Sequence, residues 1–291
     1  ISLYPGDALD GAELMKHADI AMYEAKEVRG AVRIYSQEVG TSLNRRLLLA
    51  ERLKLALAEG RLRLHYQPQI RLADGTLLGA EALLRWQEPD LGWVSPTEFV
   101  DVAERSGLMS ELGAWVLNAA FSQWSQWQGH GLHPPERLSL NISALQLVDP
   151  DFEGRLETLR RRHAVDARHI ELELTESSLI ADPEAAIALF GRLVRAGYSL
   201  AIDDFGTGYS SLSYLKRLPV SRLKIDRSFV VDIGVDADDT AIVETVVALG
   251  HNLQLRVVAE GVETHLQHDF LATLGCDQGQ GYLFSRPLDA D

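Results

Sequence analysis

IELELTE at residues 170–176 alternates apolar with polar side chains, and RLSLNIS at residues 137–143 repeats that alternation. Side chains two positions apart lie on the same face of a β-strand. Each stretch therefore predicts a strand with one apolar face and one polar face. SLAIDD at residues 199–204 and RLKIDRS at residues 222–228 follow the same rule.

An acidic or amide side chain ends each of these runs and three similar ones. The residues at the seven run ends are Glu81, Asn141, Glu173, Asp203 with Asp204, Asp226, Glu260 and Gln280. Because the same kind of side chain recurs at the same place in each run, the pattern predicts a single site assembled from many strand ends.

Helix-like segments separate the predicted strands, for example residues 183–197 and 238–252, and both end near Gly or Asn, as helices commonly do. Strands are expected near residues 63–70, 76–86, 137–143, 170–176, 199–204, 222–227, 255–260 and 279–284. Eight alternating strands favour a closed TIM-type β/α barrel over an open doubly wound sheet, which would gather its ligands at one switch point. In a barrel, functional residues lie at the C-terminal strand ends.

The predicted strand ends carry many carboxylates, and an unpaired buried carboxylate costs several kcal/mol. Any one of them could pair with an arginine or cap a loop. Taken together they predict bound cations. Oxygen ligands without His or Cys indicate Mg²⁺ or Mn²⁺ in preference to zinc.

Asp203 and Asp204 are adjacent, and adjacent strand residues point to opposite faces. We therefore expect the strand to end there, with the turn-forming residues 205–211 letting both carboxylates reach one cluster, in which Asp203 bridges two ions. Two ions at ~3.5–4 Å are a recurring device for cleaving phosphodiesters. Lys224 has the same inward parity and could hold a water or a phosphate; a salt bridge to Asp203 or Asp226 is an equal alternative.

Eight ordered motifs carry a resemblance to a known family. They are YQP at 66–68, EALLRW at 81–86, LNIS at 140–143, ELTES at 173–177, DDFGTGYSSL at 203–212, LKID at 223–226, EGVET at 260–264 and QGYLFSRPL at 280–288. Over about residues 61–288 the chain resembles the EAL family of cyclic di-GMP phosphodiesterases. The resemblance implies a modified TIM-type (β/α)8 barrel whose first strand runs antiparallel to the others.

The resemblance also implies a role for each matching residue. One metal would be held by Glu81, Asn141, Glu173 and Asp203, and the second by Asp203, Asp204 and Glu260, with Lys224 near the nucleophilic water and Lys224, Asp203 and Glu260 as the catalytic set. Substrate contacts would come from Gln67, Arg85, Asp226 and Gln280, while Glu263 supports the site and Glu176 steadies the loop 205–213.

Three segments are expected along the chain. Residues 1–36 resemble the C-terminal remnant of a GGDEF diguanylate cyclase domain without its signature loop, and the ADIAMYEAK run at 18–26 is the most recognisable part. Residues 37–60 predict one amphipathic helix, with Leu43, Leu47, Ala50, Leu53 and Leu57 along one face. That helix either packs on the barrel or transmits a signal. Residues 61–291 form the expected EAL-type barrel.

Bulk properties agree with this interpretation. A net charge of −14 argues against polymeric nucleic acid as a partner. The single Cys276 fits a reducing cytoplasm, and there is no signal peptide and no apolar run of about 18 residues. We therefore expect a cytoplasmic protein, although missing upstream segments could attach the full-length protein to a membrane.

The predicted function is metal-dependent hydrolysis of cyclic di-GMP to linear pGpG, in a homodimer formed through the barrel and downstream of GGDEF and sensory domains. The main alternative is a non-catalytic receptor for the same nucleotide, but the full set of metal-binding positions argues against it. A metalloenzyme acting on another phosphoester is a third class, and only contacts to the bases would distinguish it.

Overall fold

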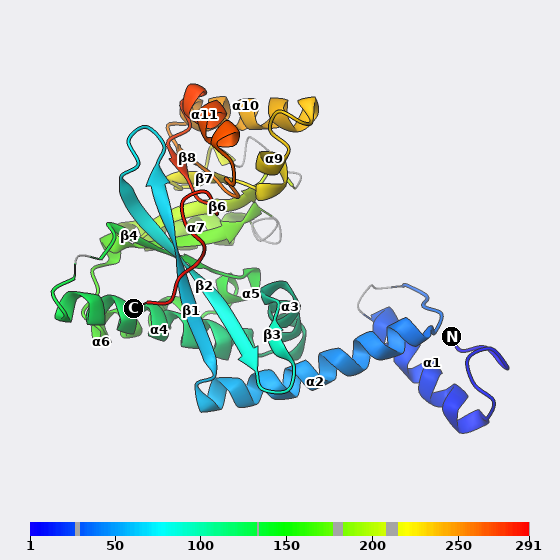
Figure 1. The fold of residues 1–291 in the computed structure, drawn as a ribbon. Coiled ribbons are helices and arrows are strands. Elements are labelled where there is room, and N and C mark those ends of the chain that lie inside the picture. Colours follow the sequence, from blue (N-terminus) through cyan, green and yellow to red (C-terminus); the bar gives the residue numbers. More distant parts are fainter. Residues whose placement is uncertain (27–29, 133, 177–182, 208–214, 291) are drawn as a thin grey trace. The chain divides into compact units, whose positions relative to one another are not determined.

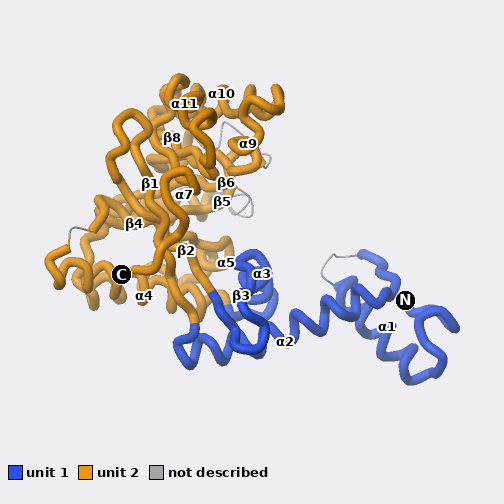
Figure 2. The backbone as a smooth tube through the Cα atoms, in the orientation of Figure 1, with its two compact units in different colours: residues 1–61, 86–108 blue, residues 62–85, 109–291 orange. Residues whose placement is uncertain are grey.

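The computed structural model describes residues 1–26, 30–132, 134–176, 183–207 and 215–290, and the chain folds into two compact units. Unit 1 comprises residues 1–61 and 86–108, and unit 2 comprises residues 62–85 and 109–291 (Figure 2). The predicted boundaries at residues 36 and 60 remain predictions.

Unit 2 is built around a closed barrel (Figure 1). Among the described residues the sheet has nine strands in the order β1-β9-β8-β7-β6-β5-β4-β2-β3, and β1 also pairs with β2. Since β3 is added only to β2, the other eight strands close the ring. The strand bounds are β1 Leu62–Arg71, β2 Leu77–Glu88, β3 Gly92–Val94, β4 Arg137–Asn141, β5 Ile170–Thr175, β6 Ser199–Phe205, β7 Arg222–Ile225, β8 Arg256–Ala259 and β9 Gln278–Gly279.

The directions of the strands confirm the predicted modified barrel. Neighbouring strands from β2 through β4 to β9 pair in parallel, whereas β1 pairs antiparallel with β9. The expected strand over residues 279–284 is wrong in length, because β9 ends at Gly279. Gly281 follows in a turn so tight that a Cβ atom there would lie 2.1 Å from the carbonyl oxygen of Val262.

The alternation of the sequence places the apolar face of each strand outward. Leu138, Leu172 and Leu223 belong to the core cluster that fills the space between barrel and helices. Ser139 and Glu173 lie on the other parity of β4 and β5, and both are buried. The barrel interior is therefore lined by polar side chains, as the strand patterns predict.

Strand β6 differs from the expectation that it ends at Asp203 and Asp204. It continues to Phe205, and its register with β7 is irregular between Ile202 and Phe205. Asp204 has a positive φ of 52°. A bulge of this kind redirects a side chain without ending the strand, and this is how both carboxylates come to lie near one another.

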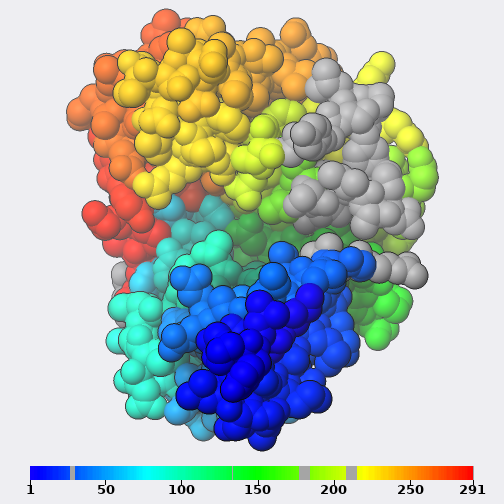
Figure 3. Space-filling view, turned by 90° about the vertical axis from the view of Figure 1, so that its right-hand side faces the viewer, coloured from blue at the N-terminus to red at the C-terminus, as the bar shows by residue number. Residues whose placement is uncertain are grey.

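Helices cover the outside of the barrel. Within unit 2, α4 packs on β1, α7 on β6, and α10 on β7 and β8. Helices α9 and α10 lie side by side on one face, in yellow to orange (Figure 3). Among the described residues the helices of this unit are α4 Met109–Gly129, α5 Ala144–Leu147, α6 Phe152–Arg162, the 3₁₀ turn η1 Ala167–His169, α7 Pro183–Arg195, α9 Arg227–Val231, α10 Ala237–Asn252 and α11 His265–Thr273.

Unit 1 contains α1 Gly11–Lys26, α2 Gln37–Glu59, β3 and α3 Pro96–Ser106. Helix α2 packs against both α1 and α3. The prediction of one long helix over 37–60 is confirmed: Ser36 caps its start and Gly60 ends it in the left-handed conformation. No described helix is both long and apolar enough to cross a membrane.

The predicted buried face of α2 is only partly correct. Leu43 and Leu53 are buried as expected, but Leu47 is 56% exposed, and Leu49 and Ala56 are buried instead. The phase of the helix is set by its partners, because α3 packs against it and supplies apolar side chains such as the buried Phe99. The sequence pattern of leucines alone left that phase ambiguous.

Candidate active site

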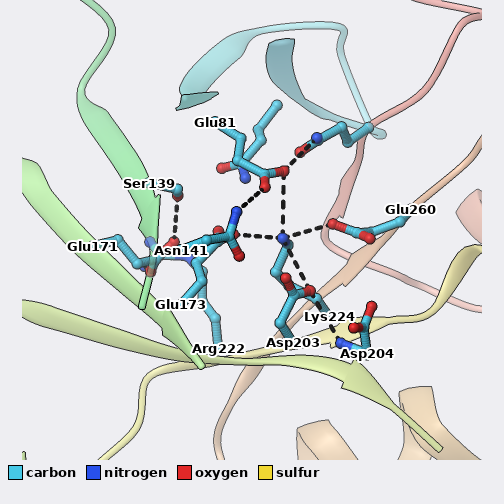
Figure 4. A network of polar contacts seen from close by, with 12 residues as sticks. Glu81, Ser139, Asn141, Glu171, Glu173, Asp203, Asp204, Arg222, Lys224 and Glu260 are labelled. Carbon is cyan, nitrogen blue, oxygen red and sulfur yellow. Dashed lines mark hydrogen bonds and ion pairs between the residues drawn. The ribbon is translucent and has the colours of Figure 1, made fainter. Parts of the chain in front are cut away.

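Polar side chains from six strands converge in the barrel at the C-terminal strand ends (Figure 4). The register pairs Asn141 of β4 with Glu173 of β5, and Lys224 lies on β7. Glu81 is on β2, Asp203 is on β6, and Glu260 directly follows β8. The predicted metal-binding residues are thus brought together.

The ammonium group of Lys224 lies at the centre of the acidic cluster. Its Nζ is 2.6 Å from Glu173 Oε2, 2.6 Å from Glu260 Oε1, 3.0 Å from Asp203 Oδ1 and 3.4 Å from Glu81 Oε2. The side chain is 1% exposed. Lys224 therefore forms the salt bridge to Asp203 that was one of the predicted alternatives. No ion pair between Lys224 and Asp226 is found among the described residues.

A chain of amide hydrogen bonds holds Glu81. Asn141 Nδ2 donates to Glu81 Oε1 at 2.6 Å, and Gln280 Nε2 donates to Glu81 Oε2 at 2.6 Å. Gln280 Nε2 also donates to Gln67 Oε1 at 3.1 Å, and Gln67 Nε2 donates to the Ser285 carbonyl. The residues predicted for substrate and those predicted for metal are thus linked in one network.

Two groups of carboxylates fit a metal ion each. The first is Glu81, Glu173 and Asp203, and the second is Asp203, Asp204 and Glu260, with ligand oxygens in each group within 4.8 Å of one another. Glu173 Oε1 is buried and accepts no hydrogen bond from any described residue. Asp203 belongs to both groups, as a bridging ligand would, so the donor set suits two hard divalent cations.

The electrostatics of the cluster agree with that fit. Burial raises the pKa of Glu173 and of Glu260 well above the usual range, and the neighbouring acids Glu81 and Asp203 raise both further against the opposing effect of Lys224. Burial also acts to raise the pKa of Glu81, but Lys224 and the hydrogen bonds from Gln280 and Asn141 outweigh it and leave that pKa lowered. The cluster therefore has more carboxyl groups than Lys224 can balance as carboxylates, and without a further cation protonation of Glu173 and Glu260 is favoured.

Asp204 and Asp226 form a coupled pair at the edge of the cluster. Burial raises the pKa of Asp204 to about 7, and the adjacent Asp203 and Asp226 add to the effect. Asp226 accepts from the Ser228 N–H at 2.8 Å and caps the start of α9. These bonds lower the pKa of Asp226 although its burial acts in the opposite direction. Asp226 is thus beside the site and is also a helix cap.

A pocket of about 230 Å³ opens beside the acids. Its lining includes Gln67, Arg85 and Gln280, which were predicted to contact substrate, together with Glu81 and Glu260. The pocket is therefore adjacent to both carboxylate groups.

Sequence reasoning did not single out the wall formed by Tyr282. The guanidinium of Arg286 lies 4.5 Å from the centre of the Tyr282 ring, and that of Arg227 lies 6.0 Å from it. Arg227 Nη2 also donates to Glu263 Oε1 at 2.8 Å. The only available signal was the position of these residues inside the LKIDR and QGYLFSR motifs.

Glu176 is expected to face away from the cluster, since it lies three residues after Glu173, and it belongs to neither carboxylate group. It is buried, and its Oε2 accepts from the Gly206 N–H at 3.2 Å. Thr207, in the loop that Glu176 is expected to steady, donates to the Asp204 carbonyl at 2.9 Å. Residues 208–213 of that loop lie outside the described residues.

A second polar layer lies one pleat below the acids and was missed. Ser139 Oγ donates to Glu171 Oε1 at 3.0 Å, and Glu171 pairs with both Arg137 and Arg222 (Figure 4). Arg137 Nη2 also donates to the side-chain oxygens of Gln69 at 2.8 Å and Gln278 at 3.0 Å. We define Ser139, Glu171, Arg137, Arg222, Gln69 and Gln278 as the lower layer, and Glu81, Asn141, Glu173, Asp203, Asp204, Lys224 and Glu260 as the upper layer.

Comparison with known proteins gives a family match. The model described as "EAL domain" matches residues 50–287. The Pseudomonas aeruginosa protein "Bifunctional diguanylate cyclase/cyclic di-GMP phosphodiesterase MucR" is 43% identical over 292 residues, which cover 100% of this chain and 42% of that protein. "Cyclic di-GMP phosphodiesterase NbdA" of the same species is 40% identical over 289 residues, covering 99% of this chain and 37% of that protein.

A solved structure is similar as well. "PaMucR Phosphodiesterase, c-di-GMP complex" is 44% identical and superposes with a TM-score of 0.80, covering 84% of this chain and 98% of that chain. The present chain spans less than half the length of the two curated relatives. Those longer proteins therefore contain regions beyond the part that this chain matches.

Proposed function

The chain belongs to the EAL-domain family, and on that premise we propose that its barrel is a metal-dependent phosphodiesterase that hydrolyses cyclic di-GMP to linear pGpG. The observation that carries the proposal is the pair of carboxylate groups sharing Asp203 beside a pocket lined by Gln67 and Arg85. The relatives named as cyclic di-GMP phosphodiesterases add support.

Each proposed role follows from a position in the site. Glu81, Asn141, Glu173 and Asp203 would hold one Mg²⁺ or Mn²⁺, and Asp203, Asp204 and Glu260 the other. When bound, two such ions supply a water of lowered pKa and neutralise charge on the phosphate oxygens. The ammonium of Lys224 is the only described cation within the cluster and would orient the attacking water. Glu260 and Asp203, both in contact with Lys224, complete the proposed catalytic set.

The pocket would hold the nucleotide. Gln67 and Gln280 present amide groups that suit the edges of guanine, and Arg85 carries a positive charge suited to a phosphate. Asp226, which hydrogen-bonds to Asp204, would accept from a base. Glu263 would act indirectly, because it holds Arg227 in the pocket wall.

The test is a hydrolysis assay with Mg²⁺ or Mn²⁺ and cyclic di-GMP, in which chromatography separates the products. We expect pGpG to accumulate and EDTA to stop the reaction. Cyclic di-AMP under the same conditions tests the base contacts and should be hydrolysed much more slowly. A wild-type protein that binds cyclic di-GMP and releases no pGpG would replace the enzyme with the receptor alternative.

The region before the barrel supports a further part of the proposal. The EAL match begins at residue 50, whereas the alignment with the bifunctional MucR covers the whole chain. We propose that residues 1–36 are the C-terminal remnant of a GGDEF-like domain, joined by α2 to the barrel, in a longer signalling protein. Barrel-mediated dimerisation belongs to the same proposal, and sedimentation of the purified chain would test it.

A further inference from the structure

Lys224 makes more contacts than a lysine that only orients a water would require. Its ammonium group lies within 3.4 Å of four carboxylates, and the two shortest distances are both 2.6 Å. Charge-assisted hydrogen bonds of this length are the strong ones. Since an ammonium has only three N–H donors, the group is saturated by its acidic partners.

The partners of Lys224 are the same groups that would hold the two ions. Glu81, Glu173 and Asp203 make up the first carboxylate group, and Asp203 and Glu260 belong to the second. Lys224 is therefore placed between the two groups and contacts both. A divalent cation that binds either group must share its carboxylates with a positive charge already present.

We propose that Lys224 is a tethered counter-ion that competes with the divalent cations for these carboxylates and so weakens metal binding. The inference deepens the proposed function, because it concerns the same metal site. The site then holds its ions less tightly than its carboxylates alone would, and its occupancy responds to the concentration of free Mg²⁺ or Mn²⁺.

Two features of the side chain favour competition over passive charge balance. The ammonium is a compact point charge on a flexible four-carbon stem, so it can withdraw from one carboxylate and keep another. Positive charges a few ångströms apart repel strongly where water is scarce, and Lys224 is 1% exposed. Glu173 still offers Oε1, which has no described hydrogen-bond partner, so a cation can enter there while Oε2 keeps its bond to the ammonium.

The experiment measures Mn²⁺ binding directly, by calorimetry at pH 8 on purified metal-free protein. Lys224→Met removes the charge and keeps much of the length of the side chain. We expect it to bind Mn²⁺ at least ~10-fold more tightly than wild type, since two charges in a water-poor site repel strongly, and to lose turnover. The matched control is Lys54→Met, at an exposed lysine of α2, which should leave the Mn²⁺ affinity unchanged. Affinity in Lys224→Met that equals or falls below that of wild type overturns the proposal.

A second readout applies if Lys224→Met folds only with metal. Ligands that bind the native state raise the melting temperature by mass action. Melting of each protein at matched Mn²⁺ concentrations should then show a larger metal-induced rise for Lys224→Met than for wild type. An equal or smaller rise rejects competition. The proposed function has its own readout, because wild type that binds Mn²⁺ yet forms no pGpG refutes the phosphodiesterase and leaves the binding comparison intact.

Discussion

The two polar layers of the barrel interior share strands β4, β5 and β7, on which they differ by one pleat. Glu171 and Glu173 are neighbours on β5, and Arg222 and Lys224 are neighbours on β7. In the lower layer two guanidinium groups enclose one carboxylate. In the upper layer one ammonium faces five carboxyl groups, from Glu81, Glu173, Asp203, Asp204 and Glu260.

The difference in charge indicates that the lower layer stabilises the barrel and the upper layer binds cations. In the lower layer every charged side chain has an oppositely charged partner, and the two guanidinium groups exceed the one carboxylate by a single positive charge. The upper layer has more carboxyl groups than its one ammonium can balance as carboxylates, and the pKa values of Glu173 and Glu260 are raised, by burial first and by the neighbouring acids in addition. Placing these acids together lowers the stability of the barrel, because like charges in a buried site are destabilising. The upper layer is therefore arranged for cations.

The largest expected effect comes from breaking the lower layer. Glu171→Gln removes the only carboxylate that Arg137 and Arg222 share among the described contacts. The free energy of unfolding should fall by about 3–5 kcal/mol, the range for removing one partner of a buried ion pair. Urea denaturation measures it. Glu184→Gln is the control, since its pair with Arg217 is exposed and should change stability by under ~1 kcal/mol. Equal losses of unfolding free energy in Glu171→Gln and Glu184→Gln would show that the buried ion pairs of the lower layer stabilise the fold no more than an exposed pair does.

The next effect should appear in turnover and not in stability. Asp203→Asn removes the carboxylate common to both metal groups, and hydrolysis of cyclic di-GMP should fall at least ~100-fold, the scale of losing one key electrostatic group. Glu81→Ala and Lys224→Ala should cause losses of similar size. Unfolding of metal-free Asp203→Asn should need no less urea than wild type, because one excess negative charge is gone. Retained turnover would show that Asp203 is no shared ligand.

The upper layer should also make metal binding depend on pH. Burial raises the pKa of Asp204 to about 7, so below that value the carboxyl group is protonated and must lose a proton to bind metal. Mn²⁺ affinity should therefore weaken up to ~10-fold per pH unit as the pH falls below 7. The raised pKa also means that this group stabilises the metal-free fold at low pH and that the stabilisation is lost as the pH rises through 7. Titrations of wild type and Asp204→Asn between pH 6 and 8 would check this, and the variant should show a weaker dependence that is not abolished, because the pKa values of Glu173 and Glu260 are raised as well.

The smallest effect should come from Glu176, which lies outside both layers. Glu176→Ala removes the acceptor of the Gly206 N–H, beside the bulge that carries Asp204. A net hydrogen bond is worth about 1 kcal/mol, so turnover and Mn²⁺ affinity should fall about fivefold. The dimer fraction in sedimentation should also decrease, with an unchanged circular dichroism spectrum. Unchanged turnover and metal affinity would make Glu176 only a charge at a strand end.

Much of the site could be predicted because strand parity is a local property. Once IELELTE is a strand, Glu171 and Glu173 must share the inner face, and the barrel then brings Glu81, Asp203 and Lys224 to the same end. Parity alone could not separate the two layers, because the pairing of Glu171 with Arg137 and Arg222 depends on the register between strands.

Two further features depend on contacts that the sequence does not encode locally. The bulge at Asp204 replaced the expected strand end, since the register between β6 and β7 shifts by pairing across the sheet. The buried face of α2 depends on α3 and not on the helix itself, so Leu49 is buried and Leu47 is exposed.

The most direct test of a two-cation upper layer is the number of Mn²⁺ ions bound per chain, measured by equilibrium dialysis with wild type, Glu171→Gln and Asp203→Asn. The account predicts two ions per chain in wild type, two in folded Glu171→Gln, and fewer than one tightly bound in Asp203→Asn. Wild type that binds no Mn²⁺, or Asp203→Asn that still binds two ions with wild-type affinity, would contradict it.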